Sequence, residues 1–431
     1  MKALFFGDVP HRIAGAQKSL LSAVKMARDF GLDPVMVFPA EGAFEKRCRD
    51  EGVRVRVLPG PPSFSVFGKA LLRKSKAEQV SVIVRETLPY ARRFARLVDE
   101  EQAEVVHYNT ARGIILAGWG AHLAGRNTVM HQRGSVAVGR LYWLAAQCLA
   151  DWILLVARAL MPEVFPSMRD RASVLYNGVH VDLPIVDRPT ARAEVARRFG
   201  DRLALDDDTR LFVSLSTPAP FKGLHYLLDA AAIAKRRGVR AAYVLAGEPK
   251  AGGYPAWLAG KLESLGLSGT VAIVGFVEDT HRLLCAADAL ILPSVEHERI
   301  EANGEVFEDR SNEGLPRSIL EAMVAGIPSI ASDIAGVSEQ IEDGASGLLV
   351  PPKDPEALAT AVEKVARDAD FRAKAGARAH EIAEARFRIE DAGRGLVSAL
   401  ADVAAQPAGI ARKLARWPAL VRDALEQPAP T

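Results

Sequence analysis

The 431-residue sequence has only three cysteines, Cys48, Cys148 and Cys285, and they are odd in number and widely scattered. Such a set excludes the disulfide framework of a small secreted domain, and it lacks the paired spacing of a zinc or redox motif. We therefore expect a chain that works in a reducing cytoplasm. The sequence predicts no metal and no other cofactor.

Long apolar runs are also missing. The apolar run that opens the sequence ends at Gly7, so it is too short for the core of a signal peptide and predicts a first buried strand. Residues 141–161 have the length of a membrane span, but Gln147, Asp151 and Arg158 interrupt them. A helix followed by a strand over residues 152–156 is the better interpretation.

Neither sign of charge dominates, because 55 Lys and Arg residues against 53 Asp and Glu residues give a net charge of +2. This balance excludes a global electrostatic argument for nucleic acid as a partner, so any basic surface has to be local. Residues 69–96 hold eight basic and two acidic residues among apolar ones, and residues 410–425 form a second basic amphipathic segment. Such segments can lie on an anionic membrane as a peripheral attachment, although their apolar faces could equally pack on a sheet.

The chain is longer than the size at which one hydrophobic core stops growing, and its 49% hydrophobic and 25% charged residues are typical of globular proteins. Short apolar, β-branched runs alternate with helical periods, which predicts βαβ units on parallel sheets. The predicted strands are residues 3–6, 35–38, 53–57, 105–108, 128–130, 152–156, 211–215, 243–246, 271–274, 289–292, 329–331 and 348–350.

We expect two doubly wound α/β domains, because this alternation stops once and then resumes. Prolines and charges replace it near residues 182–190, which predicts a hinge. The predicted organisation is an N-terminal domain over 1–181, the hinge over 182–190, a second domain over 191–385, and C-terminal helices over 386–431 that pack back toward the first domain.

The most informative window is SNEGLPRSILEAMVAGIPSIASD, residues 311–333, which contains two glutamates separated by seven residues. Pro316 suits a first helical position, the following apolar residues recur at helical spacing, and Gly326 is a stop signal. Glu313 is therefore expected in a loop and Glu321 on a helix.

The start of this predicted helix lacks a side-chain cap. If Pro316 is its first residue, the cap position falls to Leu315, which offers no acceptor for the backbone N–H groups of Arg317 and Ser318. A helix N-terminus favours an anion, so this turn could hold a diphosphate while the two glutamates accept hydroxyl groups. The alternative is an α/β protein with an ordinary helix at this position.

This window resembles the nucleotide-sugar signature of retaining glycosyltransferase family 4, in the form EGLPRSILEAM followed by AGIPSIASD. Further segments resemble that family in the expected order: AGAQKSLL (14–21), LYNGVHVD (175–182), FKGLHYLLDA (221–230), LAGE (245–248), VAIVGFVED (271–279), ADALILPS (287–294) and EQIEDGASGLLVPP (339–352). The resemblance covers nearly all of residues 1–390. It implies the GT-B architecture, in which two Rossmann-like domains face each other across a cleft.

In the second domain, the resemblance implies a donor site. Lys222 and Gly223 stand just before a predicted helix, and a lysine there provides a point charge for a diphosphate. Phe276 and Val277, in the turn after residues 271–274, resemble the segment that meets the nucleotide base. The family usually adds an arginine near Thr217, and this chain has none there; Arg317 or Arg133 could substitute.

The two glutamates take separate roles in this resemblance. Glu313 would hold the sugar hydroxyls, with the backbone of Gly314, Leu315 and Pro316 beside the donor. Glu321 would accept from the ribose hydroxyls. No metal is implied if protein cations stabilise the departing diphosphate.

In the first domain, the resemblance implies residues nearer the acceptor. Gly15 would let the donor's phosphate approach the backbone, and His131 would act close to the reacting sugar. Asn109 and Arg133, after neighbouring strands, are expected on the acceptor side. Without the family, each has an ordinary alternative as a helix start or a satisfied polar residue at a strand end.

Two acidic stretches are less clearly linked to a functional site. Residues 295–312 are longer and more acidic than usual in the family and could form a donor-side flap. Glu296, His297 and Glu298 suggest a metal site, but no second cluster supports one. Asp206, Asp207 and Asp208 precede their strand, which predicts a solvated turn at the edge of the sheet away from the ligand.

The sequence thus predicts an enzyme that transfers a sugar from a nucleotide-sugar to a hydroxyl of a glycan or lipid-linked acceptor, with retention, in cell-surface polysaccharide or glycolipid synthesis. Glu313, His131 and Lys222 are the expected catalytic residues. The alternatives are a sugar-nucleotide-binding or scaffold protein without turnover, and a GT-B epimerase or phosphorylase.

Overall fold

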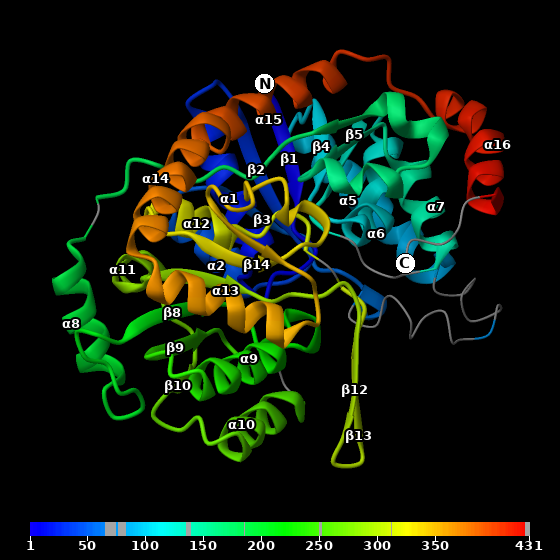
Figure 1. Ribbon diagram of the computed structural model, residues 1–431. Helices are drawn as coiled ribbons and strands as arrows, with labels where there is room; N and C mark the ends of the chain where they lie inside the picture. The colour runs from blue at the N-terminus through cyan, green and yellow to red at the C-terminus, as the bar shows by residue number, and fades with distance from the viewer. Residues whose placement is uncertain are drawn as a thin grey trace. The chain divides into compact units, whose positions relative to one another are not determined.

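The computed structural model describes residues 1–64, 75, 83–134, 139–184, 186–249, 252–311 and 313–426, except for the side chains of residues 83, 84, 335 and 410–414. The chain divides into two compact units (Figure 1). Unit 1 consists of Met1–Gly178 and Ile389–Thr431, and unit 2 of Val179–Arg388. The chain therefore passes between the units twice, after Gly178 and after Arg388.

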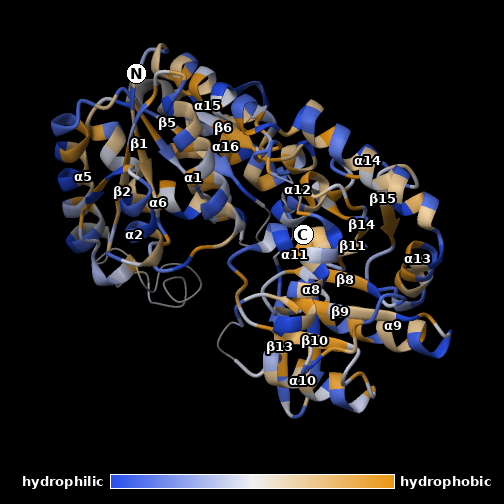
Figure 2. Ribbon diagram, turned by 90° about the vertical axis from the view of Figure 1, so that its left-hand side faces the viewer, coloured by the Kyte–Doolittle hydropathy of each residue, from blue (hydrophilic) through white to orange (hydrophobic). Residues whose placement is uncertain are grey.

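Unit 1 is built on a parallel sheet of the order β3-β2-β1-β4-β5-β6-β7 among its described residues. Its strands are β1 (Lys2–Phe6), β2 (Asp33–Phe38), β3 (Arg54–Val57), β4 (Val105–Tyr108), β5 (Asn127–Gln132), β6 (Trp152–Leu155) and β7 (Ala172–Val174). Most of these residues are buried because helices cover both faces of a parallel sheet, and Figure 2 shows the strands as mainly apolar.

The helices of unit 1 come from both ends of the chain. They are α1 (Gly15–Arg28), α2 (Ala43–Asp50), α5 (Leu88–Glu100), α6 (Ala111–Leu123), α7 (Arg140–Leu149), α15 (Ile389–Ala404) and α16 (Ile410–Glu426). Helix α15 packs on α1, and Leu396, Leu400 and Val403 lie in the same hydrophobic core as Phe5 and Leu20. The last helices thus complete the first unit.

Unit 2 repeats the architecture with the sheet order β10-β9-β8-β11-β14-β15 among its described residues. Its strands are β8 (Arg210–Leu215), β9 (Ala241–Ala246), β10 (Val271–Val274), β11 (Ala289–Leu292), β14 (Ser329–Ser332) and β15 (Gly347–Val350). Its helices are α8 (Arg188–Phe199), α9 (Leu224–Arg236), α10 (Tyr254–Ser264), α11 (Thr280–Ala286), α12 (Arg317–Val324), α13 (Pro355–Arg367) and α14 (Ala369–Arg386).

Both sheets have a topological switch point. Strand order reverses between β1 and β4 in unit 1 and between β8 and β11 in unit 2, and all pairings in the two sheets are parallel. In open α/β sheets, ligands bind beyond the carboxyl ends of the strands at such a point. The loops after β1 and β4, and after β8 and β11, are therefore the positions for a site.

The structure confirms the α/β class and the two doubly wound parallel sheets predicted from the sequence. It also confirms a helix and then a strand within residues 141–161, although the strand ends at Leu155. Within the described ranges, no helix has both the length and the apolar character needed to cross a membrane. Nearly half of the basic segment 69–96, namely residues 69–74 and 76–82, lies outside the described residues.

One element was not predicted. Residues 295–312 contain an antiparallel hairpin of β12 (Glu298–Ala302) and β13 (Glu305–Asp309), which projects as a separate ribbon in Figure 1. Asn303 and Gly304 form its turn, both with positive φ (54° and 76°), as an Asn-Gly hairpin turn requires. The sequence predicted a donor-side flap for this stretch, without strands in it.

Candidate functional site

The loop after β8 places Lys222 and Gly223 at the switch point of unit 2. A short 3₁₀ turn, η5 (Pro220–Lys222), leads into α9, and the backbone N–H of Val295 after β11 donates to the carbonyl of Phe221 at 2.7 Å. This bond ties the loop after β8 to the loop after the neighbouring strand β11. Lys222 is thereby held at the carboxyl edge of the sheet.

Gly223 is required at this position for two physical reasons. Its φ is +62°, a conformation that other residues adopt only with strain. A Cβ atom added there would lie 1.9 Å from the carbonyl oxygen of Pro293, which is an impossible contact. The glycine allows α9 to begin directly against the end of β11.

Glu313 meets Lys222 at this edge. The Lys222 Nζ atom donates to Oε1 of Glu313, and the hydroxyl of Ser294 donates to the same oxygen at 2.7 Å. Glu313 is buried, as are Gly314, Leu315 and Pro316. Three segments that are far apart in the sequence thus converge on one carboxylate, and Ser294 is a member of the group that the sequence analysis did not identify.

The helix that follows begins one residue later than predicted. Pro316 is the N-cap of α12 and Arg317 its first residue, because the φ of −59° and ψ of 120° at Pro316 are not helical. An anion can still bind at this helix start, because Pro316 also lacks a side-chain acceptor and α12 has no side-chain cap. The first N–H groups of α12 are available to an anion.

Glu321 lies on α12 with different neighbours. Its Oε1 accepts from Nε of Arg317 at 2.9 Å, one helical turn earlier, and its Oε2 accepts from the hydroxyl of Thr280 at 3.2 Å. One further nitrogen of Arg317, Nη1, is buried without a hydrogen-bond partner in the described part of the chain. A charged donor without an acceptor is costly, so this nitrogen marks a position that favours an anion or a hydroxyl group.

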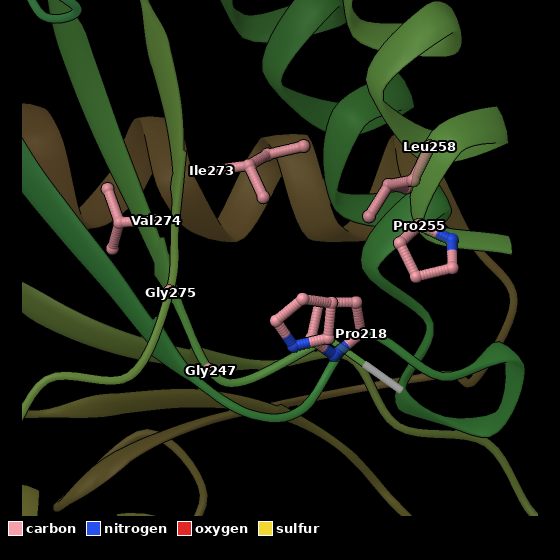
Figure 3. Close-up of a pocket in the computed structure, with 8 residues that line it drawn as sticks. Pro218, Gly247, Pro255, Leu258, Ile273, Val274 and Gly275 are labelled. Atoms are coloured by element: carbon pink, nitrogen blue, oxygen red, sulfur yellow. The ribbon is translucent and has the colours of Figure 1, made fainter. Parts of the chain in front are cut away.

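A small apolar pocket of about 190 Å³ lies at the ends of β8, β9 and β10 (Figure 3). It is lined by Pro218, Gly247, Pro249, Pro255, Leu258, Ile273, Val274 and Gly275. A flat, apolar ring such as a nucleobase suits this lining. Phe276 and Val277 are not part of it: the Phe276 side chain is 55% exposed and that of Val277 is in the core.

Unit 1 gathers a second set of polar residues at the carboxyl edge of its sheet. Gly15 is the first residue of α1, Asn109 follows β4, and His131 is the penultimate residue of β5. His131 therefore lies within the strand, whereas the sequence predicted it in the loop that follows. Of the sequence-predicted site residues in this unit, the structure brings Asn109 and Arg133 into direct contact.

His131 has a partner that the sequence analysis missed. Its Nδ1 atom lies 3.2 Å from Nε2 of His107, a buried residue of β4, with the rings nearly perpendicular. Burial, and then the charge of Arg133, hold the pKa of each histidine well below its ordinary value, so both rings are neutral at pH 7. The only sequence signal was a second histidine one residue before the end of an apolar strand.

Arg133 is held by two asparagines. Its Nε donates to Oδ1 of Asn109 at 2.8 Å, and its Nη1 donates to Oδ1 of Asn177 at 2.7 Å. Asn177 comes from the last residues of unit 1 before the chain passes to unit 2. Asn177 was not among the predicted site residues.

The acidic stretches have structural partners. Glu298 is buried, accepts from the hydroxyl of Tyr226 at 2.7 Å and lies 3.5 Å from Nζ of Lys353, so it anchors the hairpin on unit 2. Asp206 accepts from the backbone N–H groups of Asp208 and Thr209, which is the solvated turn predicted. No cluster of potential metal ligands occurs among the residues that the structure describes.

Comparison with known proteins finds a family match within unit 2. Residues 197–382 match the family model described as glycosyl transferases group 1. An alpha-D-kanosaminyltransferase from Streptomyces kanamyceticus is 31% identical over 209 residues, which cover 48% of each chain. The chain thus spans about half the length of this and several other curated relatives that it matches.

Two further comparisons cover more of the chain. A GDP-mannose-dependent alpha-(1-6)-phosphatidylinositol monomannoside mannosyltransferase from Mycobacterium tuberculosis is 28% identical over 311 residues, 69% of this chain and 75% of that protein. The crystal structure of Anabaena HepE in complex with UDP and glucose aligns with a TM-score of 0.75 at 22% identity, covering 93% of this chain and 100% of that one. This second likeness establishes the fold, which is that of the GT-B proteins.

Proposed function

Because residues 197–382 match the glycosyl transferases group 1 model and the chain has a GT-B fold, we propose that this protein transfers a sugar from a nucleotide-sugar to a hydroxyl of a glycan or lipid-linked acceptor. We propose further that the anomeric configuration is retained and that the transfer serves cell-surface polysaccharide or glycolipid synthesis. The observation that carries the proposal is the contact of Lys222 with Glu313 at the switch point of unit 2, beside the uncapped start of α12.

The chemistry follows from these groups. Lys222 and the first N–H groups of α12 stabilise negative charge on the departing diphosphate, so no metal is required for that task. Ser294 and Lys222 fix the orientation of the Glu313 carboxylate, which holds sugar hydroxyls. Glu321 accepts from the ribose, and the apolar pocket with Gly275 takes the base, with Phe276 and Val277 following it in the chain.

In unit 1, His131 acts near the reacting sugar. As a neutral ring bonded to His107, it can bind a hydroxyl group through its other nitrogen, Nε2, which is buried near the backbone of Leu175. Gly15 at the start of α1 supports the approach of a phosphate to the backbone. Asn109 and Arg133 belong to the acceptor side.

The donor can be identified by a thermal-shift screen of nucleotide-sugars. A ligand at a hundred times its dissociation constant adds about 2.7 kcal/mol to the stability of the folded state, which is enough to shift the melting temperature measurably. UDP-glucose is the first compound to test, because the HepE structure contains UDP and glucose. The anomeric proton of the product, followed by NMR with the donor so found, then tests retention: an inverted product would contradict that part of the proposal.

Attachment to an anionic membrane is part of the proposal, because unit 1 exposes large apolar side chains on neighbouring helices. Trp119 and Leu123 of α6 are 44% and 54% exposed, Leu141 of α7 is 76% exposed, and Trp417 and Leu425 of α16 are 48% and 74% exposed. Helix α7 packs between α6 and α16. We propose that these exposed side chains contact the membrane while the acceptor is glycosylated.

The alternatives remain distinct from this proposal. A scaffold protein would bind the nucleotide-sugar without turnover. An epimerase would release free sugar and nucleoside diphosphate, and a phosphorylase would need inorganic phosphate.

A further inference from the structure

The groups that surround Arg133 differ from those around four other partly buried arginines among the described residues. Arg192 and Arg372 lie near Asp288, Arg317 donates to Glu321, and Arg416 lies 3.3 Å from Asp151. Each of these guanidinium groups has a carboxylate partner. The hydrogen bonds of Arg133 within the described residues go instead to two neutral amide oxygens, those of Asn109 and Asn177.

Among the described residues, this arrangement gives the positive charge of Arg133 no carboxylate partner. Burial lowers the pKa of Arg133 to about 9, and no carboxylate raises it, so the group is still charged at pH 7. Taking a cation out of water without a counter-charge is unfavourable, and proteins rarely retain one without a use. The two asparagines fix Nε and Nη1, which orients the rest of the planar guanidinium group.

We propose that Arg133, with Asn109 and Asn177, forms an anion subsite of unit 1, and that the acceptor carries a phosphate or carboxylate group that binds there. A guanidinium fork is the side chain best matched to the planar or tetrahedral oxygens of such groups. The subsite follows β4 and β5 at the carboxyl edge of the sheet, where ligands of doubly wound sheets bind. The assignment to the acceptor rests on the proposed function, because the donor groups Lys222, Glu313 and Glu321 belong to unit 2.

A purely structural role makes a different prediction. In that case, Arg133 only links the end of β5 to Asn109 and to the segment of Asn177. Its removal then lowers the stability of the fold and leaves anion binding unchanged. The subsite requires that anion affinity depend on the arginine itself. Binding of a probe anion, measured at constant ionic strength, separates these two possibilities.

The test uses inorganic phosphate as the probe and isothermal titration calorimetry of the full chain in chloride at matched ionic strength. Lys222→Met serves as the parent protein, so that the donor site contributes less to phosphate binding. Adding Arg133→Met should weaken phosphate binding at least tenfold, which corresponds to about 1.4 kcal/mol. Adding Arg93→Met instead, an exposed arginine of the same unit that donates to the Pro59 carbonyl, should leave it unchanged.

A conservative variant guards against misfolding. Arg133→Lys keeps the charge but loses the fork, so phosphate binding should weaken several-fold in a folded protein. Unchanged affinity in Arg133→Met, or in Arg133→Lys if the methionine variant does not fold, overturns the subsite.

A second arm identifies the source of the anion. UDP affinity, measured for the wild type and for Arg133→Met, should change by less than about threefold. A tenfold loss would assign Arg133 to the donor's diphosphate and overturn the acceptor assignment. Release of nucleoside diphosphate by the wild-type protein tests the proposed function separately, and neither result depends on the other.

Discussion

Two glutamates on one short segment have different environments at the scale of single residues. Glu313 accepts from Lys222 and Ser294 at the switch point of unit 2, whereas Glu321 accepts from Arg317 and Thr280 on the side of α12. The sequence predicted both residues and their loop and helix positions. It could not predict the contact between Lys222 and Glu313, because they are 91 positions apart in the sequence and only the fold brings them together.

Substitution of each glutamate should therefore affect different kinetic constants. Glu321→Gln removes binding that is the same in the ground state and the transition state, so it should raise the donor KM about tenfold with little change in kcat. Glu313→Gln should lower kcat by about a hundredfold, because it also releases Lys222 from its fixed position. Steady-state kinetics with varied donor measure both, and Glu263→Gln on the exposed side of α10 is the control. Wild-type constants in both variants would contradict the site.

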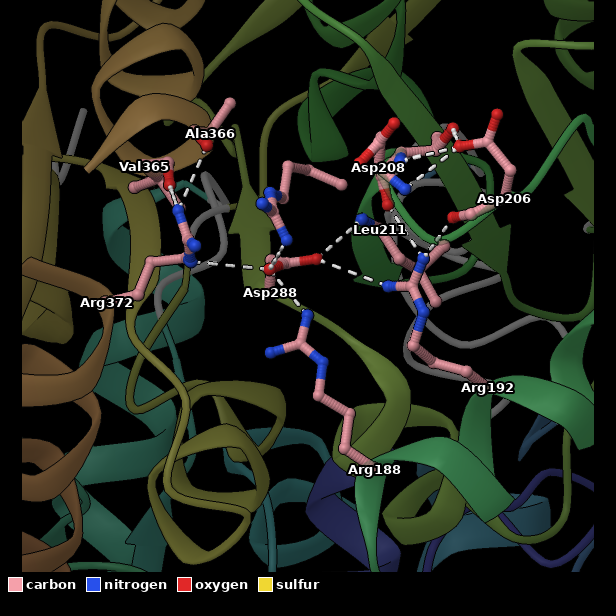
Figure 4. A network of polar contacts seen from close by, with 11 residues as sticks. Arg188, Arg192, Asp206, Asp208, Leu211, Asp288, Val365, Ala366 and Arg372 are labelled. Carbon is pink, nitrogen blue, oxygen red and sulfur yellow. Dashed lines mark hydrogen bonds and ion pairs between the residues drawn. The ribbon is translucent and has the colours of Figure 1, made fainter. Parts of the chain in front are cut away.

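Asp288 is a buried carboxylate that holds several elements of unit 2 together (Figure 4). It is fully buried before β11, accepts from the backbone N–H of Leu211 at 2.8 Å, and has four arginines around it. Their nearest nitrogens lie 2.5 to 3.9 Å away and belong to Arg188, Arg372, Arg192 and Arg210. It lies at the amino ends of the strands, so it fixes α8 and α14 to the sheet and takes no part in the site.

Asp288→Asn keeps the shape and the hydrogen bond but removes the only negative charge in contact with these arginines within the described residues. We expect the free energy of unfolding to fall by about 3 kcal/mol, the cost of leaving buried charges uncompensated. Urea denaturation measures it. Asp208→Asn removes an exposed partner of Arg240 and should cost less than about 1 kcal/mol. Equal losses in the two variants would refute the structural role of Asp288.

The hairpin illustrates what a sequence can and cannot specify at the scale of elements. Asn303 and Gly304 carry the local turn signal, yet the strands beside them are mostly charged, so apolar alternation does not identify them. Ile300 and Phe307 form a cross-strand pair, and the Phe307 ring lies against the Trp257 ring. The apolar face of the hairpin thus becomes visible only with its partner α10 in place. Its predicted use as a donor-side flap stays a prediction.

Two glycines in the apolar pocket, Gly247 and Gly275, allow a matched test of how closely the loop after β9 packs against the loop after β8. A Cβ atom at Gly247 would lie 2.2 Å from the carbonyl oxygen of Ser216, whereas one at Gly275 would meet nothing within 4 Å. Gly247→Ala should destabilise unit 2 by about 1–3 kcal/mol, since the backbone has to move, and weaken binding of the nucleotide base. Gly275→Ala should unfold like the wild type. Denaturant unfolding of both variants checks this, and equal stability would show that the two loops can separate freely.

At the scale of the whole molecule, each unit has its own sheet, its own switch point and its own set of polar groups. The periodic sequence was sufficient to predict the two sheets, because parallel strands buried on both faces read as short apolar runs. It was not sufficient for the pairs His107 with His131 and Arg133 with Asn177, which depend on strand register and on where the chain leaves unit 1.

The proposed membrane contact belongs to this scale, because α6, α7 and α16 come from distant parts of the sequence. The protein should sediment with anionic vesicles at low salt, and less at high salt, since surface charge and apolar insertion both contribute. The double variant Trp417→Ser with Leu425→Ser should have a several-fold smaller vesicle-bound fraction. Its total recovery in pellet and supernatant should equal that of the wild type. Equal recovery in the supernatant with anionic and neutral vesicles at both salt concentrations would contradict the proposal.

The most direct test of the account is the release of nucleoside diphosphate from the donor found in the screen, compared between the wild type and Lys222→Met. Lys261→Met, which removes a lysine paired with Asp229 on the same unit, is the control. The account predicts release by the wild type and by the control, and release at least a hundredfold slower by Lys222→Met, because a fixed cation next to the leaving group is lost. Donor binding without any release by the wild type would indicate a scaffold protein, and equal release by Lys222→Met would show that the diphosphate is held by other groups.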